Sequence, residues 1–209
     1  MTWDNGAGSG VLVTVSPTSS TVYTVTGTSA NGCTATDQVV VTVNQSPALN
    51  VNGNTDLCIG ESTILNASGA STYMWDNALG TNASVSVSPN TTTTYTVTGT
   101  GTNGCSSSFP VTVDVNALPT VVASSDVIIC MDDTTELTVS GADSYVWDNG
   151  AGTGDLVDVH PNTTTTYTVV GTSTNGCTST DEVVVSVNDL PTVVASDDVT
   201  ICENEVAPL

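Results

Sequence analysis

The 209-residue chain carries 21 Asp and Glu residues, one His and no Lys or Arg, which gives a formal net charge of −21 at pH 7. Because no side chain can neutralise phosphates, nucleic acids and anionic membrane surfaces are excluded as partners. No apolar run approaches the roughly 20 residues of a membrane-spanning helix, so membrane insertion is not expected. Divalent cations such as Ca²⁺ would relieve the self-repulsion of so acidic a chain, since they bind carboxylate and carbonyl oxygens.

The residue types predict an all-β fold. Thr, Ser, Val, Asn and Gly dominate the sequence, and only 10% of the residues are charged. Thr and Val favour strands, whereas Gly and Asn favour tight turns. Runs of Ala, Leu and Glu with a helical period are missing.

Internal repetition is the strongest pattern in the chain, with a constant step of 72 residues and no insertion. One Trp, one Tyr, two Pro and two Cys positions recur at this step, always in the same order. These residues are Trp3, Trp75 and Trp147; Tyr23, Tyr95 and Tyr167; Pro17, Pro89 and Pro161; Pro47, Pro119 and Pro191; Cys33, Cys105 and Cys177; and Cys58, Cys130 and Cys202.

In chain order, each unit reads as about seven short strands. The opening "LPTVVASSDVIIC" and "TTELTVSG" give the first strands, and "SYVWDNGAG" gives a strand that ends at Asn-Gly. A short "DLVDVHP" and a long "TTTTYTVVGT" follow, and the turn "TNG" leads into "CTSTDEVVVSVN". Asn-Gly between alternating runs predicts hairpins, and this number and spacing of strands predicts an Ig-like antiparallel β-sandwich.

The pattern divides the chain into four parts. Residues 1–46 form an incomplete Ig-like repeat that lacks its first two strands, and residues 47–118 and 119–190 form complete repeats. Residues 191–209 hold the first strands of a further repeat. The linkers "VNQSP", "VNALP" and "VNDLP" contain Pro and no Gly, and Pro stiffens a joint because it fixes φ. The sequence therefore predicts tandem 72-residue sandwiches that form a rod.

Two explanations are open for the incomplete repeats. One is that the sequence is a window of a longer repeat array. The other is head-to-tail association, in which residues 191–209 of one copy complete the open sandwich of residues 1–46 of the next by strand addition. Such a contact does not close on itself, so it grows a filament. Cys202 would then pair with Cys33 of the neighbouring copy.

The cysteines fall two to a repeat, which in small β domains indicates disulfides and an oxidising compartment. The bonds expected within repeats join Cys58 to Cys105 and Cys130 to Cys177. A zinc site is not expected, because no CxxC occurs and the only histidine is His160.

Taken together, the motif "YxWDNGxG…VxVxPxxTTTYTVTGTxxNGCTxTDxVVVTVNxLP…IC" resembles the tandem Ig-like or PKD-like repeats of large secreted surface and gliding adhesins of Bacteroidetes-type bacteria. Its most specific part is "TTTYTV" followed by "NGC", at residues 92–97 with 103–105 and 164–169 with 175–177. The resemblance covers essentially the whole chain. It implies an Ig-like sandwich, secretion and a structural or adhesive role, and it brings no catalytic residues.

Enzyme classes find no support in the residue inventory. His160 occurs in one repeat only, so no Ser-His-Asp set can be assembled repeat by repeat. "GAGTG" at residues 150–154 is not followed by Lys, as a phosphate-binding loop would require.

Acidic residues are candidate Ca²⁺ ligands, either after each tryptophan or crowded near the start of a repeat, where an ion would bridge two repeats and stiffen the joint. The alternatives are turn chemistry, in which Asp and Asn bind local backbone N–H groups, and a solvated acidic face. The candidates are Asp76, Asp148, Asp126, Asp132, Asp133, Glu136, Asp197, Asp198, Glu203 and Glu205.

Hydroxyl tracts and Asn-x-Ser/Thr motifs are candidate glycosylation sites, which would suit an extracellular fibre. The alternative is β-propensity combined with solvation. The candidates are Asn66, Asn82, Asn90, Asn162, Thr91, Thr92, Thr93, Thr94, Thr163, Thr164, Thr165 and Thr166.

The recurring tryptophans are expected as core anchors near the disulfides, with carbohydrate stacking as the alternative. The sequence thus predicts a non-enzymatic, extracellular structural protein that builds a rod or filament with copies of itself. The alternative is an adhesin whose repeat loops bind a carbohydrate or a surface.

Overall fold

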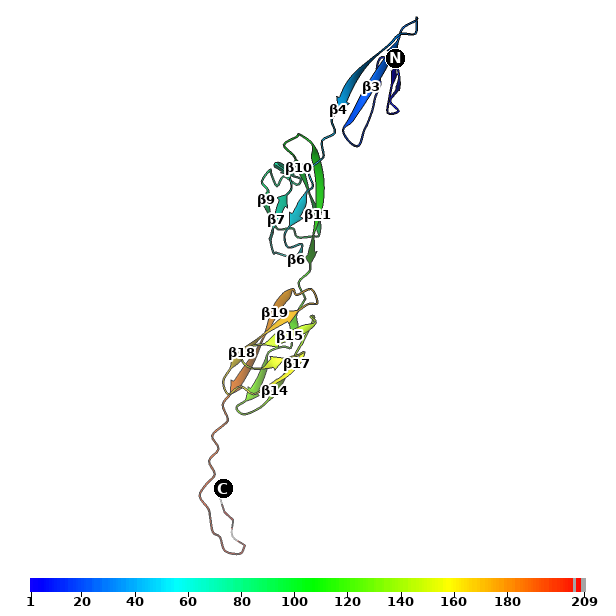
Figure 1. Ribbon diagram of the computed structural model, residues 1–209. Helices are drawn as coiled ribbons and strands as arrows, with labels where there is room; N and C mark the ends of the chain where they lie inside the picture. Colours follow the sequence, from blue (N-terminus) through cyan, green and yellow to red (C-terminus); the bar gives the residue numbers. More distant parts are fainter. Residues whose placement is uncertain (205, 208–209) are drawn as a thin grey trace. The chain divides into compact units, whose positions relative to one another are not determined.

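The computed structural model describes residues 1–204, 206 and 207, and every regular element in that part of the chain is a β-strand (Figure 1). The prediction of an all-β fold is therefore confirmed. The described residues contain no helix long and apolar enough to span a membrane. Contacts divide the chain into two compact units, Met1–Val115 and Asn116–Leu209. The finer division into four parts stays a prediction.

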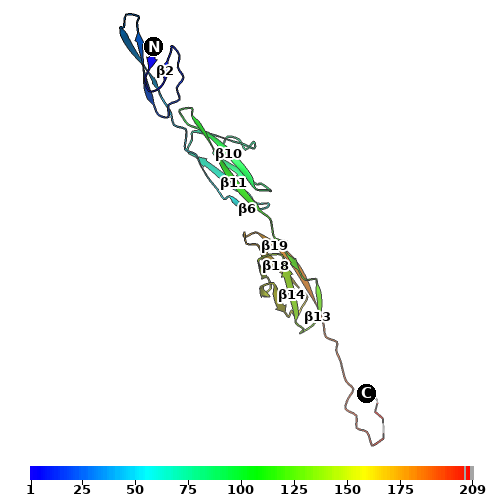
Figure 2. The same cartoon turned by 90° about the vertical axis from the view of Figure 1, so that its right-hand side faces the viewer.

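The second unit contains a sandwich of two sheets (Figure 2). One sheet has the order β12–β14–β17, and the other has the order β13–β19–β18–β15–β16. All pairs are antiparallel except β13 with β19, which are parallel. The chain thus enters through one sheet, crosses to the other at β13 and returns at β14, as in Ig-like sandwiches. The strands are β12 (Val122–Ala123), β13 (Val127–Cys130), β14 (Thr135–Ser140), β15 (Ser144–Trp147), β16 (Gly152–Thr153), β17 (Leu156–Val159), β18 (Thr165–Thr172) and β19 (Thr178–Asn188).

Alternation of apolar and polar residues along the strands places one side of each sheet in the core. Leu137, Val169 and Val183 are fully buried between the sheets, and Trp147 is 3% exposed. Its indole Nε1–H donates to the carbonyl of Gly154 at 3.2 Å, so the polar edge of the buried ring is satisfied. The prediction of a core tryptophan is therefore confirmed for Trp147, and likewise for Trp75 at the same exposure.

Residues 50–116 repeat this arrangement with sheets β5–β7–β9 and β6–β11–β10–β8. Strands β10 and β18 begin at Thr93 and Thr165, 72 residues apart, and the other long strands show the same offset. Residues whose numbers differ by 72 or 144 are called equivalent below. The strands are β5 (Asn50–Asn52), β6 (Asp56–Cys58), β7 (Thr63–Ser68), β8 (Thr72–Trp75), β9 (Ser84–Val87), β10 (Thr93–Thr100) and β11 (Ser106–Asn116).

Residues 1–46 form a single sheet of order β2–β1–β3–β4 (Figure 1). The second sheet of the other repeats has no counterpart among these residues, all of which are described. Tyr23 is accordingly the one buried residue of the segment, at 6% exposed. The strands are β1 (Thr2–Trp3), β2 (Gly8–Ser9), β3 (Thr21–Thr28) and β4 (Thr34–Val41).

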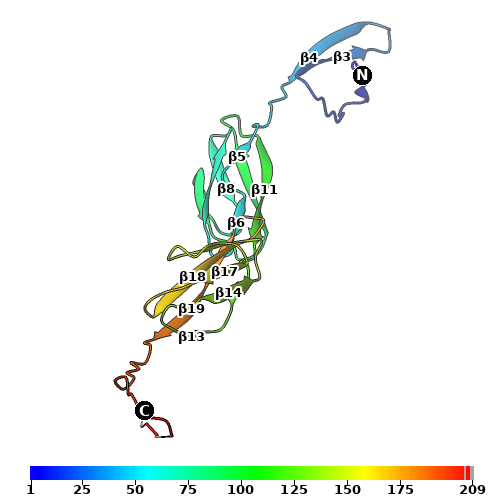
Figure 3. The same ribbon diagram turned by 90° about the horizontal axis from the view of Figure 1, so that it is seen from below.

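The chain beyond β19 forms no strand in its described residues, and Figure 3 draws it as a plain trace. The strands predicted for residues 191–209 are therefore not formed in residues 191–204, 206 and 207, and the rest of that range lies outside the described residues. The physical reason is that an extended segment becomes a strand only when its backbone groups bond to a neighbouring strand.

Candidate assembly surface

One side of the β1–β4 sheet is apolar and uncovered, and it is called the open face. It bounds a groove of about 290 Å³. In Ig-like sandwiches the corresponding side is covered by a second sheet. The groove is lined by Trp3, Tyr23, Val39 and Val41 of the sheet and by Val11, Leu12, Val13 and Val15 of the segment between β2 and β3.

The exposed fractions of equivalent residues show how the open face differs from the covered face of the complete sandwich. Val39 is 46% exposed, whereas its equivalent Val183 is fully buried. β4 also ends earlier than its equivalent β19, which continues to Asn188 and there bonds to the parallel strand β13. Both differences follow from the absence of a covering segment over residues 1–46.

The equivalent strands β3, β10 and β18 each contain one glycine, which marks the place of that covering segment. An added Cβ at Gly171 would collide with the side chain of Val121 and would lie 2.9 Å from the Cβ of Ala142. Gly99 is blocked in the same way by Leu49. At the equivalent Gly27, the nearest atom to such a Cβ is a backbone oxygen at 3.9 Å, so the space is open. The sequence reasoning missed these glycines, although a recurring Gly inside a strand is a signal of close approach.

The C-terminal segment carries the apolar residues that the open face lacks. Val193 is equivalent to Val121, and Ile201 is equivalent to Ile129. Val121 and Ile129 are each 9% exposed in the sandwich, whereas Val193 is 86% and Ile201 is 46% exposed. The described part of the chain therefore contains an uncovered apolar sheet and an uncovered apolar segment in complementary register.

The Trp-Asp-Asn-Gly stretch forms a turn that is tied to the neighbouring strand. Asp148 Oδ1 accepts the backbone N–H of Thr168 at 2.8 Å, and Asn149 donates to the Thr166 carbonyl at 2.8 Å. Asn149 has φ of +50°, a left-handed conformation that Asn tolerates. Burial, and secondly the Asp148 carboxylate, raise the pKa of the nearby Tyr167 phenol. These contacts favour turn chemistry over metal ligation for Asp148.

The cysteines depart from the expected bonding. Cys58 and Cys177 are disulfide-bonded, whereas Cys33, Cys105 and Cys130 carry free thiols. The predicted bonds Cys58–Cys105 and Cys130–Cys177 are therefore wrong for this structure.

The reason is the parallel pairing of β13 with β19. Cys130 lies opposite Asn188, whereas Cys177 precedes the first residue of β19. Eleven residues of extended chain place them about 35 Å apart, far beyond the roughly 7 Å between Cα atoms that a disulfide allows. The tryptophans are likewise not packed on a disulfide within the repeat.

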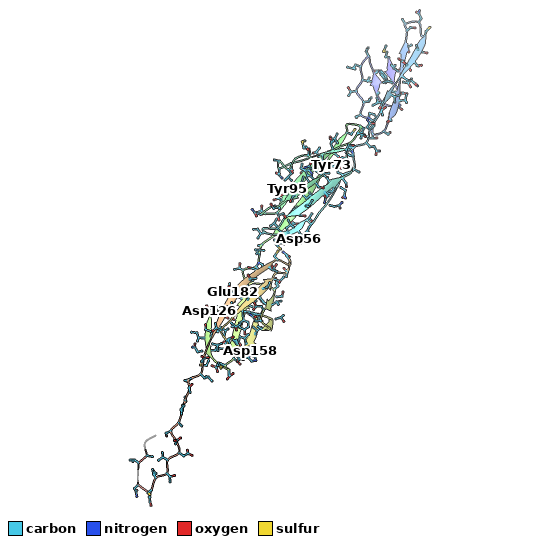
Figure 4. The ribbon with its side chains drawn as sticks, turned by 90° about the vertical axis from the view of Figure 1, so that its left-hand side faces the viewer. Asp56, Tyr73, Tyr95, Asp126, Asp158 and Glu182 are labelled. Atoms are coloured by element: carbon cyan, nitrogen blue, oxygen red, sulfur yellow. The ribbon has the colours of Figure 1, made fainter. Side chains whose placement is uncertain are left out.

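The other acids of the second unit serve its backbone or face solvent. Asp126 Oδ1 accepts the N–H of Val184 at 2.8 Å, and Figure 4 labels Asp126 close to Glu182 on the same sandwich. Asp133 Oδ2 accepts the N–H of Cys130 at 3.2 Å. Asp132 has φ of +69° and takes the turn position that Gly60 takes in the preceding repeat. Glu136 is exposed on β14.

Among the described residues, no group of three or more His, Cys, Asp or Glu is arranged to hold a metal ion. Asp76 lies in the turn after β8, and Asp197, Asp198 and Glu203 are exposed in the C-terminal segment. Glu205 lies outside the described residues. Ca²⁺ binding by these acids stays a prediction.

The glycosylation candidates are of two kinds: exposed asparagines, and threonines whose hydroxyls mostly form hydrogen bonds within the fold. Asn66, Asn82, Asn90 and Asn162 are exposed. The hydroxyls of Thr92 and Thr164 accept the backbone N–H groups of Val115 and Val187, each at 3.1 Å. The hydroxyls of Thr93 and Thr165 donate to the carbonyls of Thr91 and Thr163 at 2.6 and 2.7 Å. Thr94 Oγ1 shares a hydrogen bond of 2.8 Å with Thr112 Oγ1, and Thr166 is exposed. Glycosylation stays a prediction.

No protein-family model and no curated protein matches the sequence. Solved structures with similar folds include a Ca²⁺-stabilised adhesin that helps an Antarctic bacterium bind ice. It is 15% identical with a TM-score of 0.39, and the match covers 83% of this chain and 58% of the adhesin chain. The insect immune protein hemolin is 16% identical with a TM-score of 0.37, and the match covers 80% of this chain and 56% of hemolin. The two-domain Ig fragment of DIP-gamma is 13% identical with a TM-score of 0.35, and the match covers 68% of this chain and 98% of that fragment. Scores of this size mark a loose resemblance and transfer no function to this chain.

Proposed function

We propose that this chain is a non-enzymatic structural protein of the extracellular space that builds a filament by head-to-tail strand complementation. Residues 191–209 of one copy cover the open face of residues 1–46 in the next copy. The observation that carries the proposal is the space at Gly27, since the equivalent space at Gly171 is filled by Val121, and Val121 is equivalent to Val193.

The driving forces are those that assemble each complete sandwich. Apolar burial stabilises the contact by roughly 25 cal/mol for each Å² removed from water, and Val39, Val193 and Ile201 are exposed in the single chain. In the equivalent register, Val199 would pair with Val41 as Val127 pairs with Val185. That pairing satisfies backbone groups along the edge of β4, which β3 contacts on one side only.

The contact is heterologous, because the surface that donates the segment differs from the surface that accepts it. Each added copy therefore presents a new acceptor or donor, and growth continues without closure. The extracellular setting is supported by the disulfide-bonded state of Cys58 and Cys177, since disulfides persist in oxidising compartments.

The proposal is tested with the whole chain and a synthetic peptide of residues 191–209. Light scattering should report polymers whose size rises with protein concentration. The peptide should occupy the open face and shorten the polymers, whereas a peptide of the same composition in scrambled order should not. A chain that stays monomeric at every concentration, or polymers that ignore the peptide, would overturn the proposal.

A further inference from the structure

The first cysteine of a repeat lies near an asparagine at the end of its own repeat. The second cysteine lies near the equivalent asparagine of the preceding repeat. Cys130 lies opposite Asn188, the last residue of β19, and the N–H of Met131 donates to the Asn188 carbonyl at 2.9 Å. Cys105 lies at the opposite end of its own repeat, and its thiol donates to the carbonyl of Asn44 at 3.7 Å. Asn44 and Asn188 are equivalent; Asn188 is the last residue of β19, whereas Asn44 lies just beyond β4, which ends at Val41.

The turn before the last strand of a repeat also bonds to the preceding repeat, at or next to that asparagine. Asn103 Nδ2 donates to the carbonyl of Gln45 at 2.9 Å, and Asn175 Nδ2 donates to Asn116 Oδ1 at 2.6 Å. Asn116 is equivalent to Asn44 and Asn188. The first cysteine of a repeat and the second cysteine of the following repeat therefore belong beside the same asparagine.

We propose that, in the filament, the first cysteine of the last complete repeat of one copy bonds to the second cysteine of the repeat that follows it. This inference rests on the proposed function. The repeat completed by residues 1–46 of the next copy follows Cys130, and its second cysteine is Cys33. Cys130 of one copy therefore bonds to Cys33 of the next and locks the filament covalently.

The oxidant is a disulfide, supplied by a thiol oxidoreductase or by a small molecule. The Cys130 thiolate attacks one sulfur of that disulfide, which forms a mixed disulfide and releases one thiol. The Cys33 thiolate of the neighbouring copy then displaces the second thiol. Two protein thiols are oxidised and one external disulfide is reduced to two thiols, so atoms and electrons balance. Both protein thiols are exposed and free before the step.

The test is a peptide map of the whole chain after assembly with oxidised glutathione. The chain lacks Lys and Arg, so digestion without reductant uses a protease that cleaves at acidic residues. Mass spectrometry should find the Cys33 peptide linked to the Cys130 peptide in polymers but not in dilute chain. Cys130→Ser should abolish that linked peptide and leave polymer formation in the presence of reductant unchanged.

The outcomes separate the two proposals. Polymers in which Cys33 and Cys130 stay free, or in which Cys33 links to Cys202 or Cys130 to Cys177, would overturn the proposed disulfide and leave strand complementation intact. A chain that forms no polymer under either redox condition would overturn both.

Discussion

Val39 and Val183 occupy equivalent places in two strand pairs, each directly opposite a buried tyrosine. Val39 pairs with Tyr23 across β3 and β4, and Val183 pairs with Tyr167 across β18 and β19. The backbone pairing is the same, yet Val183 is fully buried and Val39 is 46% exposed. The difference lies in what covers each sheet, because Val183 belongs to the core of its sandwich whereas Val39 lines the open groove.

The turn after the tryptophan offers a test of the local backbone. Ala78 has φ of +59°, whereas the equivalent Gly150 has φ of +77°. A left-handed conformation costs a residue with a Cβ about 1 kcal/mol. Ala78→Gly should therefore raise the free energy of unfolding by about 1 kcal/mol, as measured by chemical denaturation.

The matched control for that prediction is Gly150→Ala. A Cβ at Gly150 meets no atom within 4 Å, so its effect reports backbone conformation alone. It should lower the free energy of unfolding by a similar amount. Equal stabilities for both variants and the parent chain would contradict the assignment of strain to this turn.

Asp181 links the two sheets of the second unit and should make its stability depend on pH. Its carboxylate accepts the N–H of Ala123 at 2.8 Å and that of Glu182 at 2.9 Å, and these bonds lower its pKa from the ordinary 3.8. The ionised form therefore favours the folded state above about pH 4, and this contribution is lost as pH falls through the lower folded pKa.

Asp181→Asn should cost about 1 kcal/mol of stability at pH 7, the net worth of a hydrogen bond. The deficit should shrink as the pH falls and the parent carboxyl becomes protonated as well. Melting curves at pH 7, 4 and 2 measure it, with Glu182→Gln as a control of equal charge change. A deficit that is the same at all three pH values would refute the role of the ionised carboxylate.

Glu136 lies directly opposite Asp158 on strands β14 and β17, and both side chains are exposed. Like charges in such a cross-strand pair destabilise a sheet by about 0.2–1 kcal/mol. In EDTA at low salt, Glu136→Gln should raise the free energy of unfolding by that amount. The gain should shrink in 1 M salt, where the screening length falls to about 3 Å.

Asp189→Asn provides the control, because it removes one negative charge at an exposed position outside the strands. If both substitutions stabilise the chain equally, net charge rather than the cross-strand pair accounts for the effect.

Much of the fold follows from local pattern. Alternation predicts strands such as β14, where Leu137 and Val139 face the core, and Asn-Gly after Trp147 predicts its turn. These features depend on residues close in the sequence, which is why spacing is enough to recognise them.

The pairing of the cysteines could not be predicted from local spacing. Spacing pairs Cys130 with Cys177 because they share a repeat, but the parallel contact of β13 with β19 sends them to opposite ends. That contact joins segments more than 50 residues apart. The role of Asp148 was also undecided by the sequence, because a carboxylate can either accept a backbone N–H or bind a cation. The hydrogen bond from the Thr168 N–H favours the role of backbone acceptor.

The most direct test of strand complementation is Gly27→Val. The substitution should leave residues 1–46 folded, because a Cβ there meets nothing closer than 3.9 Å and a branched residue suits a strand. It should block the space that Val193 of the next copy would fill. Thr28→Val introduces the same apolar side chain on the opposite side of β3, away from the space at Gly27, and serves as the control.

Sedimentation velocity over a range of concentrations measures both variants beside the parent chain. Strand complementation predicts that the parent and Thr28→Val polymerise, whereas Gly27→Val sediments as a folded monomer. Polymers of Gly27→Val that form at the same concentration as those of the parent would contradict it.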